Sequence, residues 1–410
     1  MEMQEYPYPG STLQLSRRSL RQERSKPELR KITLHHRIRE DENPHAKEIK
    51  EFDCRISLAN ESKENLLTDQ EIEVYKKLLR KAREYELQRH DVILCTCTAA
   101  SSPTLTRKVS ARYILIDECA MATEPQALIP LVCNQPEKIV LLGDHKQLRP
   151  IVHHERVKKM GMSISLFERY IKVFKKRTVM LNTQYRMHED ICKFPSKAYY
   201  DGLLQTKVDC RDSVLCANLK PTPIVFGDIR GEEISLVVST AKGNENSKAN
   251  REERDLAVNI AQQLVEKGKI DQQSIAILSP YNAQVSEIRK DLSEKKMGEV
   301  TVTTITKSQG SEWRYIILST VRSLASEEIE KEPDRAWLSK HIGFVGDPNQ
   351  INVAITRAKE GLCIIGNQEL LNCSGAWRQL LEHYKANGCV TMANKIDVQS
   401  VVKKPSIRVF

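Results

Sequence analysis

The 410-residue sequence lacks the features that would assign it to several common classes of protein. It has no run of 18 apolar residues, which a membrane-spanning helix would need. Its first 30 residues are polar and basic, so they do not resemble a secretory signal. Its eleven cysteines include no set of Cys-x-x-Cys or Cys/His spacings that would hold zinc, and we interpret them as reduced core thiols. We therefore expect an intracellular protein of the cytoplasm or the nucleus.

A further absence concerns phosphate binding. The pattern Gly-x-x-x-x-Gly-Lys-[Ser/Thr] occurs nowhere in the chain. In nucleotide-binding proteins this loop supplies a cradle of backbone amides, a lysine for the phosphates and a hydroxyl for Mg²⁺. A nucleotide bound by this chain would therefore lack the amide cradle, the lysine and the hydroxyl that such a loop supplies.

The composition is that of a globular chain with an excess of positive charge. Hydrophobic residues make up 40% of the chain and charged residues 29%, and the length suggests two or three domains. The formal net charge is +10, which favours an anionic partner, and nucleic acid is the usual one. The alternative is a neutral core with basic residues gathered near the N-terminus.

Two short apolar runs that end in acid carry the clearest functional signal. They occupy residues 113–120 and 138–150. Runs of this length predict strands that are buried on both faces, and in open α/β sheets function lies at the carboxyl ends of such strands. The apolar part of the first run ends at Asp117 and Glu118, and that of the second ends at Gly143, Asp144 and Gln147.

A strand that ends in Asp-Glu is the Walker B arrangement. In that arrangement Asp117 would hold the Mg²⁺ of a nucleotide, and Glu118 would orient or deprotonate the attacking water. The alternative is a pair of solvated acids that cap a helix. The second acid-ended strand, which follows closely, favours the nucleotide site.

A long helix and a strand are predicted ahead of this pair. Residues 68–87 carry an apolar stripe at helical spacing, and Thr68 and Glu71 fit a capping box. The opposite face of that helix is basic, and it either touches phosphates or is merely solvated. Residues 91–100 predict a buried strand that ends at Thr98, whose hydroxyl could donate to a phosphate oxygen.

Behind the pair, residues 178–188 predict an apolar strand that ends in Gln-Tyr-Arg. One interpretation places Tyr185 on the face of a base and Arg186 at a phosphate. The other is a polar loop with a solvated arginine.

Strands and helices then alternate through the rest of the chain. The region 228–254 indicates loops and short strands, with 242–250 polar and turn-like. Strands are predicted at 274–281, 300–306, 315–322 and 361–366, and helices at 254–267, 284–294 and 352–359. Such alternation predicts an α/β fold with doubly wound parallel sheets, arranged here as two domains.

With these motifs in order, the chain resembles the superfamily 1 helicases of the nonsense-mediated-decay helicase type, over roughly residues 30–385. Six stretches match that family's motifs in sequence order. They are the DExx box at 117–120, motif III at 143–150, the opening of the second domain at 184–188, motif IV at 278–284, motif V at 304–313 and motif VI at 352–358.

The resemblance implies two RecA-like domains, ATP and Mg²⁺ as cofactors, and an ATP-driven helicase that moves 5′ to 3′ on a single strand, more often RNA than DNA. By that carry-over Asp117 coordinates Mg²⁺, Glu118 activates water and Gln147 senses the γ-phosphate. Arg186 and Arg357 reach the phosphates. The nucleotide is further contacted by Gln184, Tyr185, Gly310 and Glu312, and the strand by Thr98, Pro280, Asn282 and Thr304.

The missing phosphate-binding loop is the main departure from the family pattern. In the family that loop precedes everything matched here, so we expect this chain to be either the C-terminal part of a longer polypeptide or the product of a truncated gene model. In both cases the first sheet would have a gap that exposes apolar strand edges. We expect these divisions: a disordered or remnant segment at 1–30, a helical insertion at 31–90, a partial first RecA-like domain at 91–182, a second RecA-like domain at 183–385 and a tail at 386–410.

Two other functions remain open at this stage. A nucleic-acid binding module that keeps the fold without ATP turnover would explain the missing lysine. A transcriptional coactivator or scaffold is the third reading, and the resemblance extends to nuclear receptors as partners. However, the chain contains no Leu-x-x-Leu-Leu box to support that role.

Overall fold

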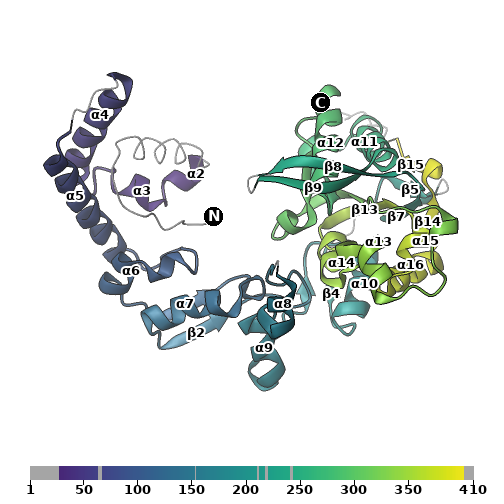
Figure 1. Cartoon of the computed structure of the whole chain (residues 1–410), viewed down its shortest axis with the longest axis horizontal. Coiled ribbons are helices and arrows are strands. Elements are labelled where there is room, and N and C mark those ends of the chain that lie inside the picture. The colour runs from purple at the N-terminus through teal and green to yellow at the C-terminus, as the bar shows by residue number, and fades with distance from the viewer. Residues whose placement is uncertain are drawn as a thin grey trace, which may run out of the picture. The chain divides into compact units, whose positions relative to one another are not determined.

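The chain divides into two compact units (Figure 1). Our computed structural model describes residues 27–62, 67–152, 154–209, 212–217, 220–240 and 243–400. Unit 1 comprises Met1–Gly143 and Pro150–Tyr170, and unit 2 comprises Asp144–Arg149 and Ile171–Phe410. No helix in the described ranges is long and apolar enough to cross a bilayer.

Unit 2 is built on a six-stranded sheet in the order β11-β10-β12-β13-β7-β14, and every neighbouring pair is parallel. The sheet and the segments around it confirm the α/β alternation that the sequence predicts. The strands are β7 Ile224–Asp228, β10 Ile275–Ser279, β11 Thr301–Thr304, β12 Trp313–Ser319, β13 Ala358–Gly366 and β14 Val390–Met392. The main helices are α10 Glu189–Tyr199, α11 Arg251–Glu266, α12 Asn282–Glu294, α13 Arg335–His341, α14 Pro348–Ile355, α15 Gln368–Leu371 and α16 Gly375–Ala386.

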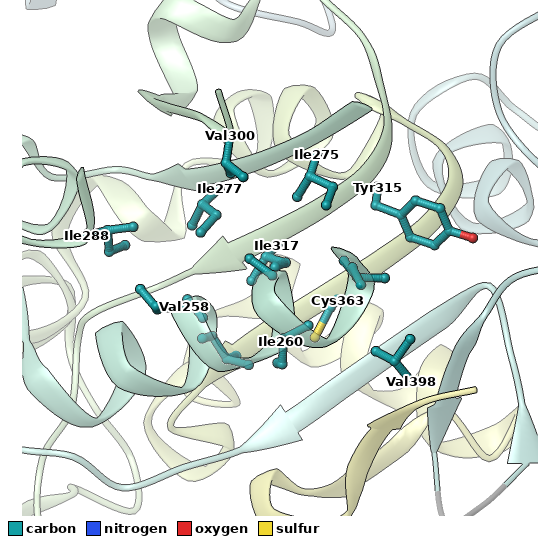
Figure 2. Packing of buried hydrophobic residues seen from close by; sticks show 14 of the residues in the cluster. Val258, Ile260, Ile275, Ile277, Ile288, Val300, Tyr315, Ile317, Cys363 and Val398 are labelled. Atoms are coloured by element: carbon teal, nitrogen blue, oxygen red, sulfur yellow. The ribbon is translucent and has the colours of Figure 1, made fainter. Parts of the chain in front are cut away.

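The core of unit 2 lies between this sheet and the helices α11 and α12. Ile277 of β10, Ile317 of β12 and Cys363 of β13 are fully buried together with Ile260 of α11 and Ile288 of α12 (Figure 2). Parallel strands of this kind are buried on both faces, which is why they are rich in isoleucine and valine. This core fixes the carboxyl ends of the strands, where functional residues are expected.

A long antiparallel hairpin, β8 Glu233–Thr240 and β9 Gly243–Asn250, extends from unit 2 beside α12 (Figure 1). The sequence predicted short strands and a polar turn here, and that prediction is wrong for 243–250. The polar strand β9 exists because every one of its residues pairs with β8, so cross-strand contacts rather than its own hydrophobicity define it. Lys248 of β9 forms an ion pair with Glu233 of β8.

Smaller strands complete unit 2. Residues 396–398, in the segment expected to be a tail, pair antiparallel with residues 215–217. The remaining short strands are β3 Thr183–Gln184, β4 Gln205–Thr206, β5 Leu215–Ala217, β6 Lys220–Pro221 and β15 Ile396–Val398.

Unit 1 begins with a helical cluster. The helix α5, Asp69–Gln88, starts at the capping box that the sequence predicts, with Thr68 and Glu71 bonded reciprocally. Its buried side packs on α3 Leu34–Arg37 and α4 Ala46–Ser62 through Ile38, Ile49, Tyr75, Leu78 and Ala82. The further helices from this region to the start of unit 2 are α2 Pro27–Arg30, α6 Pro103–Lys108, α7 Glu124–Asn134, α8 Glu155–Val157 and α9 Leu166–Val173.

The sheet of unit 1 consists of two parallel strands, β1 Tyr113–Ile116 and β2 Lys138–Leu141. Both strands lie where the sequence predicts them, but the predicted burial on both faces is wrong. The side chain of Leu115 is 63% exposed and that of Ile139 is 48% exposed. Two parallel strands cannot cover their own faces, so the apolar side chains that would face neighbouring layers meet solvent instead.

One other predicted strand does not form, and another forms only at its end, as β3. Residues 91–100 contain no strand, and residues 178–182 lead into β3 without joining a sheet. Their apolar side chains are exposed, as Leu94 and Leu181 show. An apolar run becomes a strand only when a neighbour pairs with it, and none of the described segments pairs with these two. Cys95 lies in the first run and is exposed, as are Cys54 and Cys133, so the prediction of core thiols fails at those three positions.

A strained turn follows β12. Val321 has a φ of 71°, and the amide of Arg322 donates to the carbonyl of Thr320 at 2.8 Å, which makes a γ-turn. A β-branched residue in this backbone region is costly and must be held by its surroundings. The holder is Glu253 of α11, whose Oε2 accepts the Val321 amide at 2.9 Å and the Ser319 hydroxyl at 2.7 Å.

Glu253 should make the stability of the protein depend on pH. It is fully buried, and burial raises the pKa of its carboxyl from 4.5 to about 7. Because the folded state then holds the proton more tightly than the unfolded state, this carboxyl stabilises the fold at low pH, and that contribution is lost as the pH rises through about 7. Substitution by glutamine removes this contribution to the pH dependence of stability. The free energy of unfolding of Glu253→Gln, relative to that of the wild type, should therefore rise by about 2–3 kcal/mol from pH 5 to pH 8.5.

Denaturant unfolding at several pH values measures this difference. Glu266→Gln, on the exposed face of the same helix, is the matched control and should keep a constant difference from the wild type. A constant difference for Glu253→Gln as well would show that the carboxyl does not titrate in this range.

Candidate functional site

The acidic pair of unit 1 lies directly after β1. Asp117 and Glu118 are both exposed, and the amide of Glu118 donates to Asp117 Oδ1 at 2.9 Å. Glu118 has left-handed backbone angles, φ 50° and ψ 35°, and the chain then turns inward to the buried Cys119. Non-glycine residues with such backbone angles are uncommon, and strained backbone of this kind clusters at functional sites. The turn presents both carboxylates at the strand end while the thiol is buried.

The end of β2 lies against the same turn. The carbonyl of Leu142 accepts the amide of Cys119 at 2.8 Å. At Gly143 a Cβ atom would lie 3.1 Å from the amide nitrogen of Ala120, so a larger residue would push the two strand ends apart. The two acid-ended runs are thus neighbours in space, as their parallel pairing requires.

Asp117 is suited to hold Mg²⁺. Protein sites for this ion use one or two carboxylates and leave the other positions to water and substrate phosphates. An exposed carboxylate at the end of a strand meets that need. No group of three or more metal-ligating side chains occurs among the described residues. Thr98, the predicted strand contact of unit 1, is exposed and precedes the turn Ala99–Ser101.

In unit 2 the segment Asp144–Arg149 is anchored by its own side chains. Asp144 Oδ1 accepts the amide of Lys146 at 2.8 Å, and Asp144 Oδ2 accepts the side-chain amide of Gln147 at 2.9 Å. This leaves Gln147 Oε1 to accept from Arg357 Nη2 at 3.2 Å. Two residues that the sequence assigns to phosphate recognition, 210 positions apart, are therefore in contact.

The guanidinium of Arg357 is buried, with a side chain 2% exposed. It donates to the carbonyl of Val353 at 3.0 Å and to the hydroxyl of Thr356 at 3.0 Å besides its contact with Gln147. The sequence predicted an arginine that reaches the phosphates. In this structure it lies within unit 2, on the residue that was assigned to sense the γ-phosphate.

Arg186 and Lys359 share one carboxylate. Glu312 accepts from Lys359 Nζ and from Arg186 Nε, each at 2.6 Å. The hydrogen bonds of Lys359 and Arg186 lower the pKa of Glu312, so it remains ionised. Arg186 also donates to the main-chain carbonyl of Thr356 at 3.2 Å, and Thr356 is the residue before Arg357 in the sequence. This is a charged surface with two cations for one anion, suited to receive phosphates.

Gln184 holds the loop that presents Tyr185. Its Oε1 accepts the amides of Arg186 and Met187, and its Nε2 donates to the Met187 carbonyl at 2.8 Å and to the Thr206 hydroxyl at 2.7 Å. Tyr185 itself is 72% exposed. An exposed aromatic ring on a rigid loop can stack on a base.

The residues of unit 2 that are predicted to contact a nucleic-acid strand lie at one edge of its β-sheet. Ser279, the residue before Pro280, pairs with Thr304, so both lie at the carboxyl ends of adjacent strands. Asn282 begins α12 there, and its amide donates to Glu245 of the β8–β9 hairpin at 2.5 Å. Gly310 lies elsewhere, in the turn before β12, with a φ of 78° that favours glycine.

Sequence reasoning missed three residues of unit 2. Asn349 donates to the carbonyls of His145 and Gln147, Asn352 donates to the carbonyl of Lys146 at 2.9 Å, and Tyr200 donates to Asp144 Oδ2 at 2.6 Å. Asn352 lies inside a motif, but its partner Lys146 is 206 positions away. Tyr200 lies in no motif, and nothing in its sequence neighbourhood indicates a partner.

Comparison with known proteins gives two family matches. Both have the description "AAA domain", one over residues 8–155 and one over residues 162–369. The second alone covers half of the chain.

Similar proteins point the same way. The chain is 48% identical over 404 residues to the 3′-5′ exoribonuclease HELZ2 of Mus musculus and 49% identical over 402 residues to that of Homo sapiens, and each match covers 97% of this chain. It is 35% identical to a regulator of nonsense transcripts 1 homologue of Neurospora crassa over 83% of this chain. The matched part is 13%, 14% and 30% of the length of those three proteins, respectively.

Proposed function

Since the chain belongs to the superfamily 1 helicases of the nonsense-mediated-decay helicase type, with RecA-like domains, we propose that it is the part of an ATP-driven helicase that carries the catalytic acids, the γ-phosphate sensor and the arginines. The observation that carries this proposal is the hydrogen bond between Gln147 and Arg357. It joins a sensor candidate to an arginine candidate that lies 210 positions further along the chain.

The chemistry follows from the residue types. Water attacks the γ-phosphorus of ATP, its new P–O bond forms as the bond to the bridging oxygen breaks, and ADP leaves. Glu118 would take the proton of that water. Mg²⁺, held by Asp117 when the nucleotide binds, would neutralise charge on the phosphates. Gln147, Arg186 and Arg357 would stabilise the negative charge that develops on the transferred group.

The proposed substrate is a single strand, with RNA favoured over DNA. The names of the relatives refer to ribonuclease activity and to transcripts, and the formal charge of +10 suits any nucleic acid. We propose that the edge formed by Pro280, Asn282 and Thr304 touches the strand and that movement runs 5′ to 3′.

Binding without turnover is the second candidate function. One observation favours it, namely that the sequence contains no Gly-x-x-x-x-Gly-Lys-[Ser/Thr] loop. The phosphate cradle of an active enzyme would then have to come from other residues.

Glu118→Gln separates the two candidates. We expect it to lower ATP hydrolysis by about 10²–10⁴-fold, because glutamine cannot accept the proton of water, while a single-stranded oligonucleotide binds as before. The measurement is steady-state hydrolysis, together with strand affinity by fluorescence anisotropy, in the longest natural polypeptide that contains these residues. Glu124→Gln, in the next helix of unit 1, is the matched control. Equal hydrolysis by Glu118→Gln and the wild type would remove Glu118 from the chemistry.

A further inference from the structure

Tyr200 directly follows the last residue of α10, and it lies outside the six stretches that match the helicase motifs. Its hydroxyl makes two hydrogen bonds with opposite roles. It donates to Asp144 Oδ2 at 2.6 Å, and it accepts from the side-chain amide of Asn352 at 2.9 Å. Burial, and then the negative charge of Asp144, raise the pKa of Tyr200, so the hydroxyl keeps its proton at neutral pH and remains a donor.

The two partners of Tyr200 belong to opposite sides of one network. On one side Asp144 accepts the amide of Gln147, which turns Gln147 Oε1 toward Arg357. On the other side the main-chain carbonyl of Asn352 accepts a hydrogen bond from the hydroxyl of Thr356 at 2.7 Å. The same hydroxyl oxygen accepts from the guanidinium of Arg357 at 3.0 Å.

These contacts close a ring of hydrogen bonds. The ring runs from Tyr200 through Asp144, Gln147, Arg357, Thr356 and Asn352 back to Tyr200. Because each member donates to or accepts from the next, the geometry of one bond constrains the others. Tyr200 is the one aromatic member, and its hydroxyl adds a side-chain link between the segment 144–149 and the helix α14 to the direct bonds from Asn349 and Asn352.

The orientation of the Asn352 side chain in this ring is tightly constrained. Asn352 is fully buried, and its Oδ1 has no hydrogen-bond partner among the described residues. The orientation of its side-chain amide therefore depends on the two hydrogen bonds that its Nδ2 donates, to the Lys146 carbonyl and to the Tyr200 hydroxyl. An amide flip would bring an oxygen against the Lys146 carbonyl, which is repulsive. Without the Tyr200 hydroxyl, one N–H of Asn352 would be buried without an acceptor.

We propose that Tyr200 is a positioning residue for ATP hydrolysis, which closes this ring and thereby holds the side-chain amide of Gln147 in register with the guanidinium of Arg357. The inference rests on the proposed function and deepens it. Tyr200 touches neither nucleotide nor nucleic-acid strand in this scheme, so it acts on the rate of hydrolysis only through the contact between Gln147 and Arg357.

The test compares two adjacent tyrosines. Tyr200→Phe removes only the hydroxyl of the ring, and Tyr199→Phe removes a hydroxyl that has no hydrogen-bond partner in the part of the chain that the structure describes. Steady-state ATP hydrolysis in the presence of a single-stranded oligonucleotide is measured for both in the longest natural polypeptide that contains this chain. We expect Tyr200→Phe to lower kcat at least tenfold with the KM for ATP and the strand affinity within threefold, and Tyr199→Phe to match the wild type.

A merely structural tyrosine is distinguished by a double substitution. If Tyr200 acts through Gln147, then Tyr200→Phe combined with Gln147→Ala should hydrolyse ATP no more slowly than Gln147→Ala alone. Multiplying effects, or a kcat of Tyr200→Phe equal to that of the wild type, would overturn the inference while the proposed function stands. A wild-type protein without hydrolysis would overturn the proposed function, and the inference with it.

Discussion

Arg357→Ala should reduce strand-stimulated ATP hydrolysis by about 10³-fold or more, because a guanidinium that neutralises charge on a transferring phosphoryl group contributes about 10³–10⁵ to its rate. The affinity for a single-stranded oligonucleotide should stay within a few-fold. Arg357→Lys should fail nearly as badly, since an ammonium cannot reproduce the planar set of donors that contacts Gln147, Thr356 and Val353. Steady-state hydrolysis and fluorescence anisotropy measure the two quantities.

The burial of Arg357 makes a control essential. Removing a buried side chain with several hydrogen bonds also lowers the stability of unit 2, so thermal unfolding of each variant must accompany the kinetics. Arg378→Ala removes an exposed arginine on α16 and should leave hydrolysis unchanged. A folded Arg357→Ala protein with wild-type turnover would sink the assignment of this arginine to the phosphates.

Strand binding should weaken steeply with salt. A protein that neutralises about five phosphates of a single strand releases counterions on binding, and its affinity falls roughly 100-fold between 50 mM and 200 mM salt. The net charge of +10 makes such contacts available. Titration of a fluorescent oligonucleotide at several salt concentrations gives the slope directly.

The basic face of α5 offers a way to locate those contacts. Lys77 and Lys81 are exposed on it. If that face is merely solvated, Lys77→Gln combined with Lys81→Gln should leave the slope unchanged, whereas a face that touches phosphates should reduce it. A flat response of the unaltered protein would contradict the idea that the positive charge serves strand binding.

The sequence predicted the sheet of unit 2 well, for a physical reason. Segments such as Ile275–Ser279 and Tyr315–Ser319 are buried at every position, and apolar except for the final serine, because both faces of a parallel sheet are covered. The same logic failed for 91–100 and 178–182, since apolarity cannot reveal whether a neighbouring strand is present. It also failed for β9, which is polar and depends on its partner β8.

The sequence predicts candidate residues for the site, but it does not predict their contacts. The acid-ended strand indicated Asp117 and Glu118, and the resemblance to the helicases added the proposed roles of Gln147 and Arg357. The carboxyl end of β1 carries the two acids as expected. Nothing in the sequence says that Arg357 is buried against Gln147, because that contact depends on how α14 packs. The link through Tyr200 is invisible for the same reason, since hydrogen bonds over 56 and 152 positions leave no local pattern.

The most direct test is the wild-type arm of the Glu118 experiment. Hydrolysis of ATP is measured with and without a single-stranded RNA oligonucleotide, in the longest natural polypeptide that contains these residues. An ATP-driven motor should hydrolyse ATP at least tenfold faster when the strand is present. Strand binding with no hydrolysis under either condition would contradict the motor function and leave the nucleic-acid binding module as the function of this fold.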